Sequence, residues 1–303
     1  MTTNTTLVLG DLIEMTLDEL YSELERPRPT QLGANITSTQ TTITLVGFDY
    51  VSVTDILEVG NELMTVTAKT SDANPTFTVI RGYSATTAIA HTTTETVLIN
   101  PHWTRNMVTR AINQFYTGSA PALLPYIRAD VMNTASKAGV GQQLIPLAAD
   151  VIRVLEVRYQ SPTSGRIVDL YGWRHEDNLP TAISSSGMGL RISSVVSPTD
   201  DLLVTMKARY QWVGVGETAT IQVPMGTEDI APAHAAARLL SGREISRLEL
   251  DRLIESANDT AVRSGSNLGL IKLRWQEVYR RIDEAKRLLP VPRPLVFRRF
   301  QNG

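Results

Sequence analysis

Residues 55–70, DILEVGNELMTVTAKT, hold two runs of alternating apolar and polar side chains around a central Gly60-Asn61. Alternation with a period of two residues is typical of β strands, and a Gly-Asn pair suits the tight turn of a hairpin. Two flanking segments, ITSTQTTITLV and TFTVIRGY, are also rich in threonine and valine and poor in charge. We therefore predict a small β module over residues 30–99, inserted between helices.

The segment before this module has the apolar pattern of a helix. Residues 11–25, DLIEMTLDELYSELE, repeat large apolar side chains every three or four positions, and a Pro-Arg-Pro sequence follows at 27–29. That spacing places one apolar stripe on a helix, and proline ends the helix. We predict an N-terminal core helix within residues 1–29, with a stripe formed by Ile13, Leu17, Leu20 and Leu24.

Two further core helices and a second β region are predicted downstream. Asn100-Pro101 is a typical helix start, with asparagine as N-cap and proline in the first turn. A second, less regular helical pattern covers about 121–138, which gives core helices over 100–142. Alternating segments then run from LIPL to TATIQV and predict a second β region over 143–223.

The next part of the chain has helical patterns. We expect three helices over 224–289, at about 228–241, 243–263 and 268–289. The last carries an apolar seam with 4-3 spacing, suited to one neighbouring helix such as the N-terminal one. The seam consists of Ile271, Trp275, Val278, Ile282, Ala285 and Leu289. These patterns predict an α+β fold: a helical bundle core with two inserted antiparallel β regions and an extended C-terminal arm.

The sequence ends in PVPRPLVFRRFQNG, residues 290–303, with three prolines and three arginines. Proline fixes φ and disfavours helix in the residue before it, so this arm is expected to be extended. Its apolar side chains need burial, and another subunit or another protein is a natural place for it. We predict a docking arm formed by Pro290, Pro292, Arg293, Pro294, Leu295, Val296, Phe297, Arg298, Arg299 and Phe300.

The 303 residues carry a net charge of −2, but the charge is distributed unevenly. Residues 1–100 hold 4 Lys or Arg against 12 Asp or Glu, whereas residues 231–303 hold 14 against 8. This asymmetry favours head-to-tail pairing of subunits, or contact of the basic end with an acidic partner or with DNA. The arginine-rich stretch 272–287 permits phosphate contacts, although a solvated helix face also explains it.

Composition excludes several classes of chemistry. The chain has no cysteine, which rules out disulfides, thiolate nucleophiles, cysteine-bound zinc and iron–sulfur clusters. The N-terminus lacks the basic start of a signal peptide, and no apolar segment approaches the roughly 20 residues needed to cross a bilayer. We therefore expect a protein without a membrane partner.

No motif with catalytic or ligand-binding spacing stands out. VGVGET at 213–218 and GMGL at 187–190 do not join a strand to a helix as a phosphate-binding loop does, so both are predicted turns. Metal-ligand spacing is absent from the four histidines, which are His91, His102, His175 and His234. We predict a protein that is not an enzyme and has no catalytic residues, no cofactor and no metal.

Two other classes of function stay open. A hydrolase with a scattered carboxylate site in the second β region would gather Asp169, His175, Glu176 and Asp177 around a pocket. A carbohydrate- or surface-binding module would use the Thr-rich β region, although Tyr50 and Tyr83 are few aromatic side chains for that purpose.

The segment EVGNELMTVTAK…FTVIRGYSATTAIAHTTTETV resembles a pattern of bacteriophage virion proteins. The residues that carry the resemblance are Glu62, Met64, Arg81, Gly82, Thr86, Thr87, His91 and Val97. The resemblance implies a small β module in which an Arg-Gly turn and a Thr/His loop close one strand onto the next, and these roles are structural. The chain departs from the pattern at Ala85 and Glu95, where glycine is usual.

The wider layout resembles phage head-to-tail adaptor (connector) proteins. The resemblance implies a homo-oligomeric ring of about twelve copies around the DNA channel. It also implies an arm docked on the portal protein, a tail stopper or other tail protein as neighbour, and non-specific proximity to genomic DNA. Such a protein is made in the host cytoplasm and located in the virion neck, at the head–tail interface. Another phage neck or tail structural protein is the nearest alternative.

Overall fold

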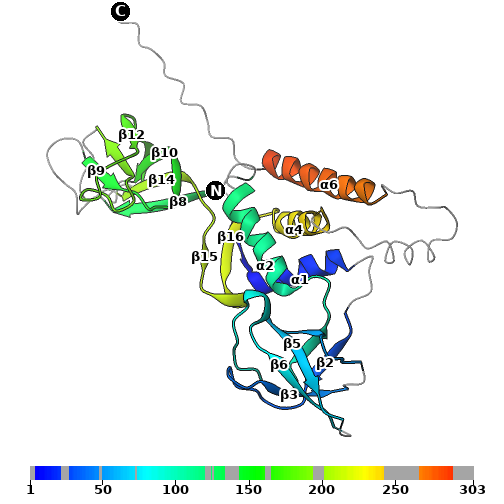
Figure 1. Cartoon of the computed structure of the whole chain (residues 1–303). Helices are drawn as coiled ribbons and strands as arrows, with labels where there is room; N and C mark the ends of the chain where they lie inside the picture. The colour runs from blue at the N-terminus through cyan, green and yellow to red at the C-terminus, as the bar shows by residue number, and fades with distance from the viewer. Residues whose placement is uncertain are drawn as a thin grey trace, which may run out of the picture. The chain divides into compact units, whose positions relative to one another are not determined.

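The computed structural model describes residues 4–21, 27–47, 50–71, 74–119, 124, 126–133, 143–160, 165–193, 201–241 and 266–288. The chain divides into two compact units, each built from separate stretches of sequence (Figure 1). The barrel unit comprises residues 9–113 and 231–275, and the sheet unit comprises residues 1–8, 114–230 and 276–303.

The predicted helical bundle core is wrong. Strand accounts for 37% and helix for 28% of the structure, and the strands form a closed barrel and several sheets. An apolar stripe with 4-3 spacing predicts that a helix has one buried face. It does not predict whether another helix or a sheet covers that face. The Thr- and Val-rich segments form their own closed core, so they are more than insertions in a bundle.

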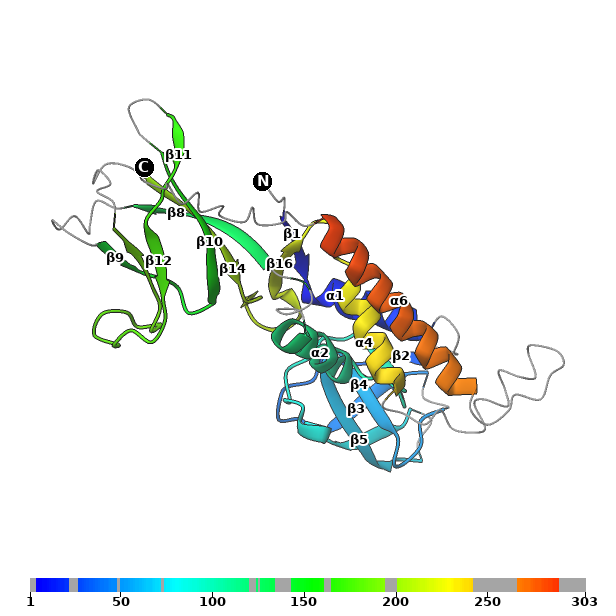
Figure 2. The same ribbon diagram turned by 90° about the horizontal axis from the view of Figure 1, so that it is seen from above.

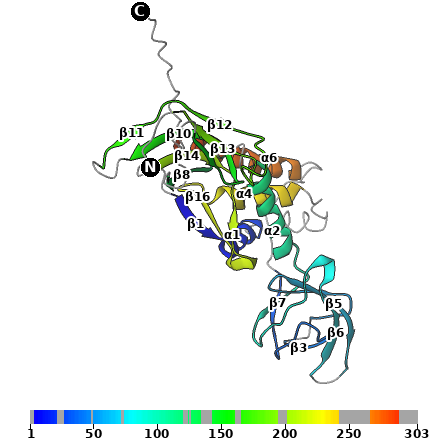
Figure 3. The ribbon, with the colours of Figure 1, turned by 90° about the vertical axis from the view of Figure 1, so that its left-hand side faces the viewer.

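The barrel unit is centred on six antiparallel strands closed in the order β2-β3-β6-β5-β4-β7 (Figures 1 and 3). Closure pairs every strand on both sides, which removes free edges. Val59 pairs with Glu62 across Gly60-Asn61, where Gly60 has φ 54°, so the predicted hairpin turn is confirmed. The strands are β2 Pro29–Leu32, β3 Thr42–Val46, β4 Ile56–Val59, β5 Glu62–Lys69, β6 Thr76–Ile80 and β7 Thr96–Ile99.

Helices complete the barrel unit: α1 Leu9–Leu20, α2 Arg105–Gln114, α4 Ile230–Ser241 and the first part of α6 Ser266–Leu288. The Tyr21 and Trp103 rings meet edge to face with centroids 5.3 Å apart, which ties the end of α1 to the approach to α2. Arg274 of α6 pairs with Glu19 of α1 at 2.9 Å. The first part of α6 runs beside α4 (Figure 2).

The helix predicted to start at Asn100-Pro101 begins at Arg105 instead. Asn100 has φ 48°, and its side chain is committed to the barrel: Oδ1 accepts from the Ile56 amide at 2.8 Å, and Nδ2 donates to Asp55 at 2.8 Å. An asparagine held in this way cannot also cap a helix that follows it.

Thr104 is the residue that caps α2. Its hydroxyl accepts from the Met107 amide at 3.2 Å, and the buried Glu58 carboxylate accepts from the Arg105 amide at 2.6 Å. A carboxylate at the N-terminal end of a helix is favoured because that end carries partial positive charge. The barrel strand β4 therefore contributes directly to the start of α2.

The sheet unit contains three antiparallel sheets, ordered β11-β10-β14-β8, β12-β13-β9 and β1-β16-β15 (Figure 2). The first two share one apolar core that includes Val154, Met206 and Leu190. The strands are β1 Asn4–Val8, β8 Tyr126–Asn133, β9 Gln143–Pro146, β10 Val151–Gln160, β11 Ile167–Asp169, β12 Trp173–Glu176, β13 Gly189–Ile192, β14 Asp201–Ala208, β15 Trp212–Val213 and β16 Thr220–Pro224.

Strand β10 buries every third residue, Val151, Val154 and Val157, although a regular strand buries every second one. Its pairing with β14 shifts register between Val151 and Arg153 and again between Val154 and Glu156. Each irregularity adds a residue to β10 and turns the side chains that follow to the other face of the sheet. The spacing of three between its buried valines, which would suit a helix, therefore results from bulges in a strand.

The helix predicted over about 121–138 is also wrong, because β8 occupies Tyr126–Asn133. It pairs in unbroken register with β14, from Tyr126 opposite Ala208 to Asn133 opposite Asp201. Eight pairs along one neighbour outweigh a weak local helical preference. The predicted helix over 243–263, the arm over 290–303 and the seam residue Leu289 lie outside the described residues.

Candidate functional site: a buried ionic network in the barrel

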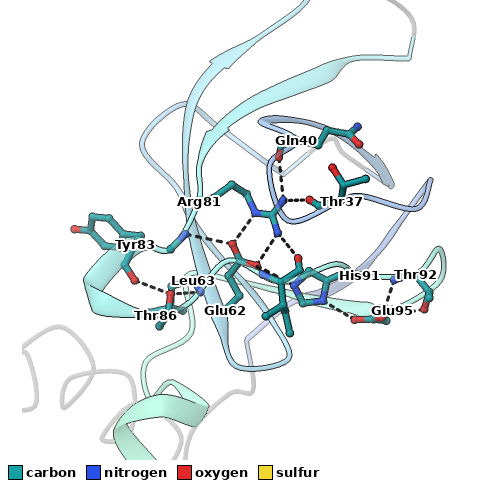
Figure 4. A network of polar contacts seen from close by, with 12 residues as sticks. Thr37, Gln40, Glu62, Leu63, Arg81, Tyr83, Thr86, His91, Thr92 and Glu95 are labelled. Carbon is teal, nitrogen blue, oxygen red and sulfur yellow. Dashed lines mark hydrogen bonds and ion pairs between the residues drawn. The ribbon is translucent and has the colours of Figure 1, made fainter. Parts of the chain in front are cut away.

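The most connected group of polar side chains in the barrel unit surrounds Glu62 (Figure 4). Glu62 is the first residue of β5, directly after the Gly60-Asn61 turn, and its side chain has no exposed surface. Arg81 directly follows β6, and His91 lies in the connection from β6 to β7. The closed pairing of these strands brings the three residues together across gaps of 19 and 29 positions in sequence.

Arg81 uses all five of its N–H groups. Nε and Nη2 donate to the two Glu62 oxygens at 2.6 and 2.7 Å, a side-on bidentate pair. The other three donate to backbone carbonyls of Thr37 at 2.7 Å, Gln40 at 2.9 Å and Ile89 at 2.6 Å. A guanidinium has five donors, so this one is saturated and joins three segments of backbone.

Glu62 accepts from five donors in turn. Besides the two from Arg81, these are the amides of Gly82 at 3.2 Å and Ile89 at 3.1 Å, and His91 Nε2 at 3.0 Å. Burial raises the pKa of this carboxyl, but the hydrogen bonds from Arg81, Ile89 and His91 outweigh it and hold the pKa below its ordinary value. The buried charge is therefore fully compensated.

His91 joins the network to a second carboxylate. Its Nδ1 lies 2.8 Å from Glu95 Oε2, and its backbone exchanges two hydrogen bonds with Ile36. Glu95 Oε1 also accepts from the Thr92 amide at 2.7 Å and hydroxyl at 2.9 Å. Burial raises the pKa of Glu95, whereas the bonds from Thr92 and His91 lower it, and the net direction is downward.

The Thr86 hydroxyl fastens the Arg-Gly turn to β5. It accepts from the Leu63 amide at 3.0 Å and donates to the Tyr83 carbonyl at 2.8 Å. Gly82 has φ 64°, and a Cβ there would lie 2.9 Å from the Thr86 carbonyl oxygen, so the turn requires glycine. Ala85 also has a positive φ, 61°, at a position where glycine would be unstrained.

Of the eight residues behind the phage-virion resemblance, five lie in this network: Glu62, Arg81, Gly82, Thr86 and His91. Two others, Met64 and Val97, are in the barrel core, and Thr87 is exposed. Sequence reasoning noted Glu95 only as a departure from the pattern and missed its bond to His91. The spacing of four residues between a histidine and a carboxylate was the available signal. Donors and acceptors saturate one another, so the arrangement acts as a clamp on the loops.

The predicted apolar seam of α6 is buried at Val278, Ile282 and Ala285, and partly buried at Ile271 and Trp275. Two neighbouring arginines of α6 are engaged in ion pairs. Arg280 pairs with Glu277 and Glu284, each at 2.6 Å, and Arg281 pairs with Asp229 at 3.0 Å and Glu277 at 2.9 Å. These carboxylates offset the positive charge that phosphate contacts would require.

The residues of the hydrolase alternative lie on or beside two different sheets. Glu176 on β12 binds Arg191 at 2.9 Å, His175 lies 3.5 Å from Asp177, and Asp169 is exposed on β11 of another sheet. Among the described residues, no group of three or more His, Asp or Glu side chains is placed to hold a metal ion.

The two glycine motifs are turns, as predicted. Gly214 and Gly216 have φ of 94° and 67° between β15 and β16, and Gly187 has φ 72° before β13. His234 on α4 is buried edge-on against Trp275, and burial together with Arg238 lowers its pKa to about 4.

No family model, no curated protein and no solved structure matches this chain. Over the described part of the chain, no helix is both long enough and apolar enough to cross a membrane.

Proposed function

We propose that this chain is a structural virion protein, a head-to-tail adaptor that joins the portal to the tail as an oligomeric ring around the DNA channel. Its role is assembly, and it acts through surfaces and the C-terminal arm. The virion neck is the proposed location, with the portal protein and a tail protein as partners.

The observation that carries the proposal is the role of the residues behind the phage-virion resemblance. Glu62, Arg81, Gly82, Thr86 and His91 hold one another by hydrogen bonds, with Glu62 fully buried. These are the structural roles that the resemblance implies, an Arg-Gly turn and a Thr/His loop closing one strand onto the next. The support is therefore a match between motif and geometry.

Exposed apolar side chains give a second line of support. Val213, at the end of β15, and Val215, in the connection to β16, are 71% and 86% exposed. On the barrel, Ile80 and Ile89 are 56% and 46% exposed. Neighbours in an assembly would remove the apolar surface of these side chains from water.

The first experiment is cryo-electron microscopy of the particles with which the protein co-purifies. A ring between portal and tail, with the arm over 290–303 ordered against the portal, is the expected result. Density in a tail tip would replace the adaptor with another tail protein, and absence from particles would contradict both.

The second experiment tests the arm directly. Deletion of 290–303 is expected to leave a folded protein that does not bind its portal, because the arm supplies the apolar contacts. Substitution of the exposed Tyr171, which is 71% exposed on the sheet unit, by serine is the matched control. Portal binding at full affinity without the arm would contradict the proposed docking.

A further inference from the structure

The ring of His91 lies between two carboxylates, with both nitrogens in hydrogen-bond contact (Figure 4). Nε2 is 3.0 Å from Glu62 Oε2, and Nδ1 is 2.8 Å from Glu95 Oε2. The His91 side chain is 2% exposed, so the ring itself is shielded from bulk water.

An ionised carboxylate only accepts hydrogen bonds, and a neutral imidazole has a single N–H. A neutral ring would therefore turn a nitrogen lone pair towards one of the two carboxylates. The charge count points the same way. The cluster contains two carboxylates, Glu62 and Glu95, and one cation, Arg81, so a second cation on His91 brings the cluster to neutrality.

We propose that His91 is a pH-sensitive latch: its doubly protonated ring bridges Glu62 and Glu95, and loss of one proton releases Glu95 and the turn 92–95. This inference is independent of the proposed function, because it concerns the barrel alone.

On loss of the proton, the contact of His91 with Glu95 is the one that breaks. Glu62 keeps four other donors, from Arg81, Gly82 and Ile89, when a neutral ring still donates through Nε2. Glu95 is 37% exposed and has Thr92 as its other partner, so water can take over its solvation. The unprotonated Nδ1 of His91 then faces Glu95, which holds the ring less strongly than Glu62 does.

The charged groups around His91 come from three segments of the barrel unit. Glu62 begins β5, Arg81 follows β6, and Glu95 precedes β7. The segment 32–36 packs against the turn through backbone bonds, with Thr94 N donating to Leu32 O at 2.9 Å, and has no charged residue. Among the described residues, no other charged side chain is hydrogen-bonded or ion-paired to the His91 ring.

The released turn holds part of the barrel closed. The Leu32 amide at the end of β2 donates to the Glu95 carbonyl at 3.0 Å, and Thr93 N donates to Asn35 Oδ1 at 2.6 Å. The Thr92 amide, which donates to Glu95 Oε1, is the first group that should lose protection. The amides bound to Glu62 should keep theirs.

The test is nuclear magnetic resonance of the full chain with ¹⁵N-labelled histidine, followed over a pH titration together with amide exchange. His91→Gln assigns the ring signals, and Glu95→Gln assigns them independently if the first variant does not fold. The expected result is two protonated ring nitrogens at pH 6. Loss of one of them on raising the pH should accompany about tenfold faster exchange at Thr92, with the Ile89 amide unchanged.

Glu95→Gln keeps an oxygen acceptor but removes the charge, so it is expected to move the loss of the proton to lower pH. Asp177→Asn is the matched control, because His175 faces that single carboxylate at 3.5 Å in the sheet unit. That control should leave exchange at Thr92 unchanged. A singly protonated His91 at pH 6, a proton loss without faster exchange at Thr92, or a ring that keeps both protons until the protein unfolds would each overturn the latch.

Discussion

Replacement of Arg81 by alanine should open the barrel far more than removal of a surface arginine. Arg81 and Glu62 side chains are 6% and 0% exposed, and the pair is bidentate. Removal of Arg81 leaves the buried Glu62 carboxylate with only two amides and His91 as donors, and loss of one partner of a buried ion pair costs about 3–5 kcal/mol. The carbonyls of Thr37, Gln40 and Ile89 would lose a donor as well.

Amide hydrogen exchange along β5 and β6 is the suitable assay, because a chain of two units need not unfold in one step. Arg280→Ala is the matched control: this arginine also binds a carboxylate through two nitrogens, but it is 57% exposed. We expect the free energy of barrel opening to fall by about 3–5 kcal/mol in Arg81→Ala and to stay unchanged in the control. A cost below about 1 kcal/mol, the range of surface pairs, would refute the view that burial sets the strength.

A double-mutant cycle separates the ion pair from general damage. Glu62→Met together with Arg81→Met should be less destabilising than the sum of the two single changes, because the double variant leaves neither charge unpaired. Arg81→Lys should fall between wild type and Arg81→Ala, since a lysine keeps the charge but has no planar fork. Additive effects would mean that Glu62 and Arg81 do not act as a unit.

Three further outcomes are expected. Ala85→Gly should stabilise the barrel by up to about 1 kcal/mol in thermal unfolding, because φ at this position is 61°, and Ala88→Gly, with no such strain, should not stabilise it. Gly82→Ala should lower the unfolding temperature, since the new Cβ would meet the Thr86 carbonyl oxygen at 2.9 Å. The pKa of Glu62 is lower in the folded state than its ordinary value, so the stability that it contributes is present above the ordinary carboxyl pKa and is lost as the pH falls through the folded value. Acid titration of amide exchange in the barrel should show this loss, and Glu62→Gln should flatten it.

The barrel strands were predictable because their signals are local. Alternation over 55–70 and the Gly60-Asn61 pair specify a hairpin whatever lies around it. The start of α2 was not predictable, because Asn100 is a good cap by residue type and is diverted by contacts to Ile56 and Asp55, about 45 positions earlier in the chain.

The polar network was visible in part. The residues of the Arg-Gly turn stood out by resemblance, but nothing in the sequence shows that Glu62 lies within reach of Arg81 and His91. Those contacts depend on the closure of the barrel, which is a property of six strands together. Strand β8 was not predicted for the same reason: it is formed by pairing with β14, whose residues are far away in the sequence.

All six barrel strands lie in the continuous stretch 29–99, whereas the unit that contains them is completed only by residues 231–275. At 5–20 residues per second, a ribosome needs roughly 7 to 26 seconds to travel between these two parts of the message. The barrel can close on the nascent chain during that interval, before α4 and the start of α6 have been synthesised. The barrel is therefore synthesised well before its unit is complete. A chain interrupted near residue 230 would contain the closed barrel but would lack α4 and α6.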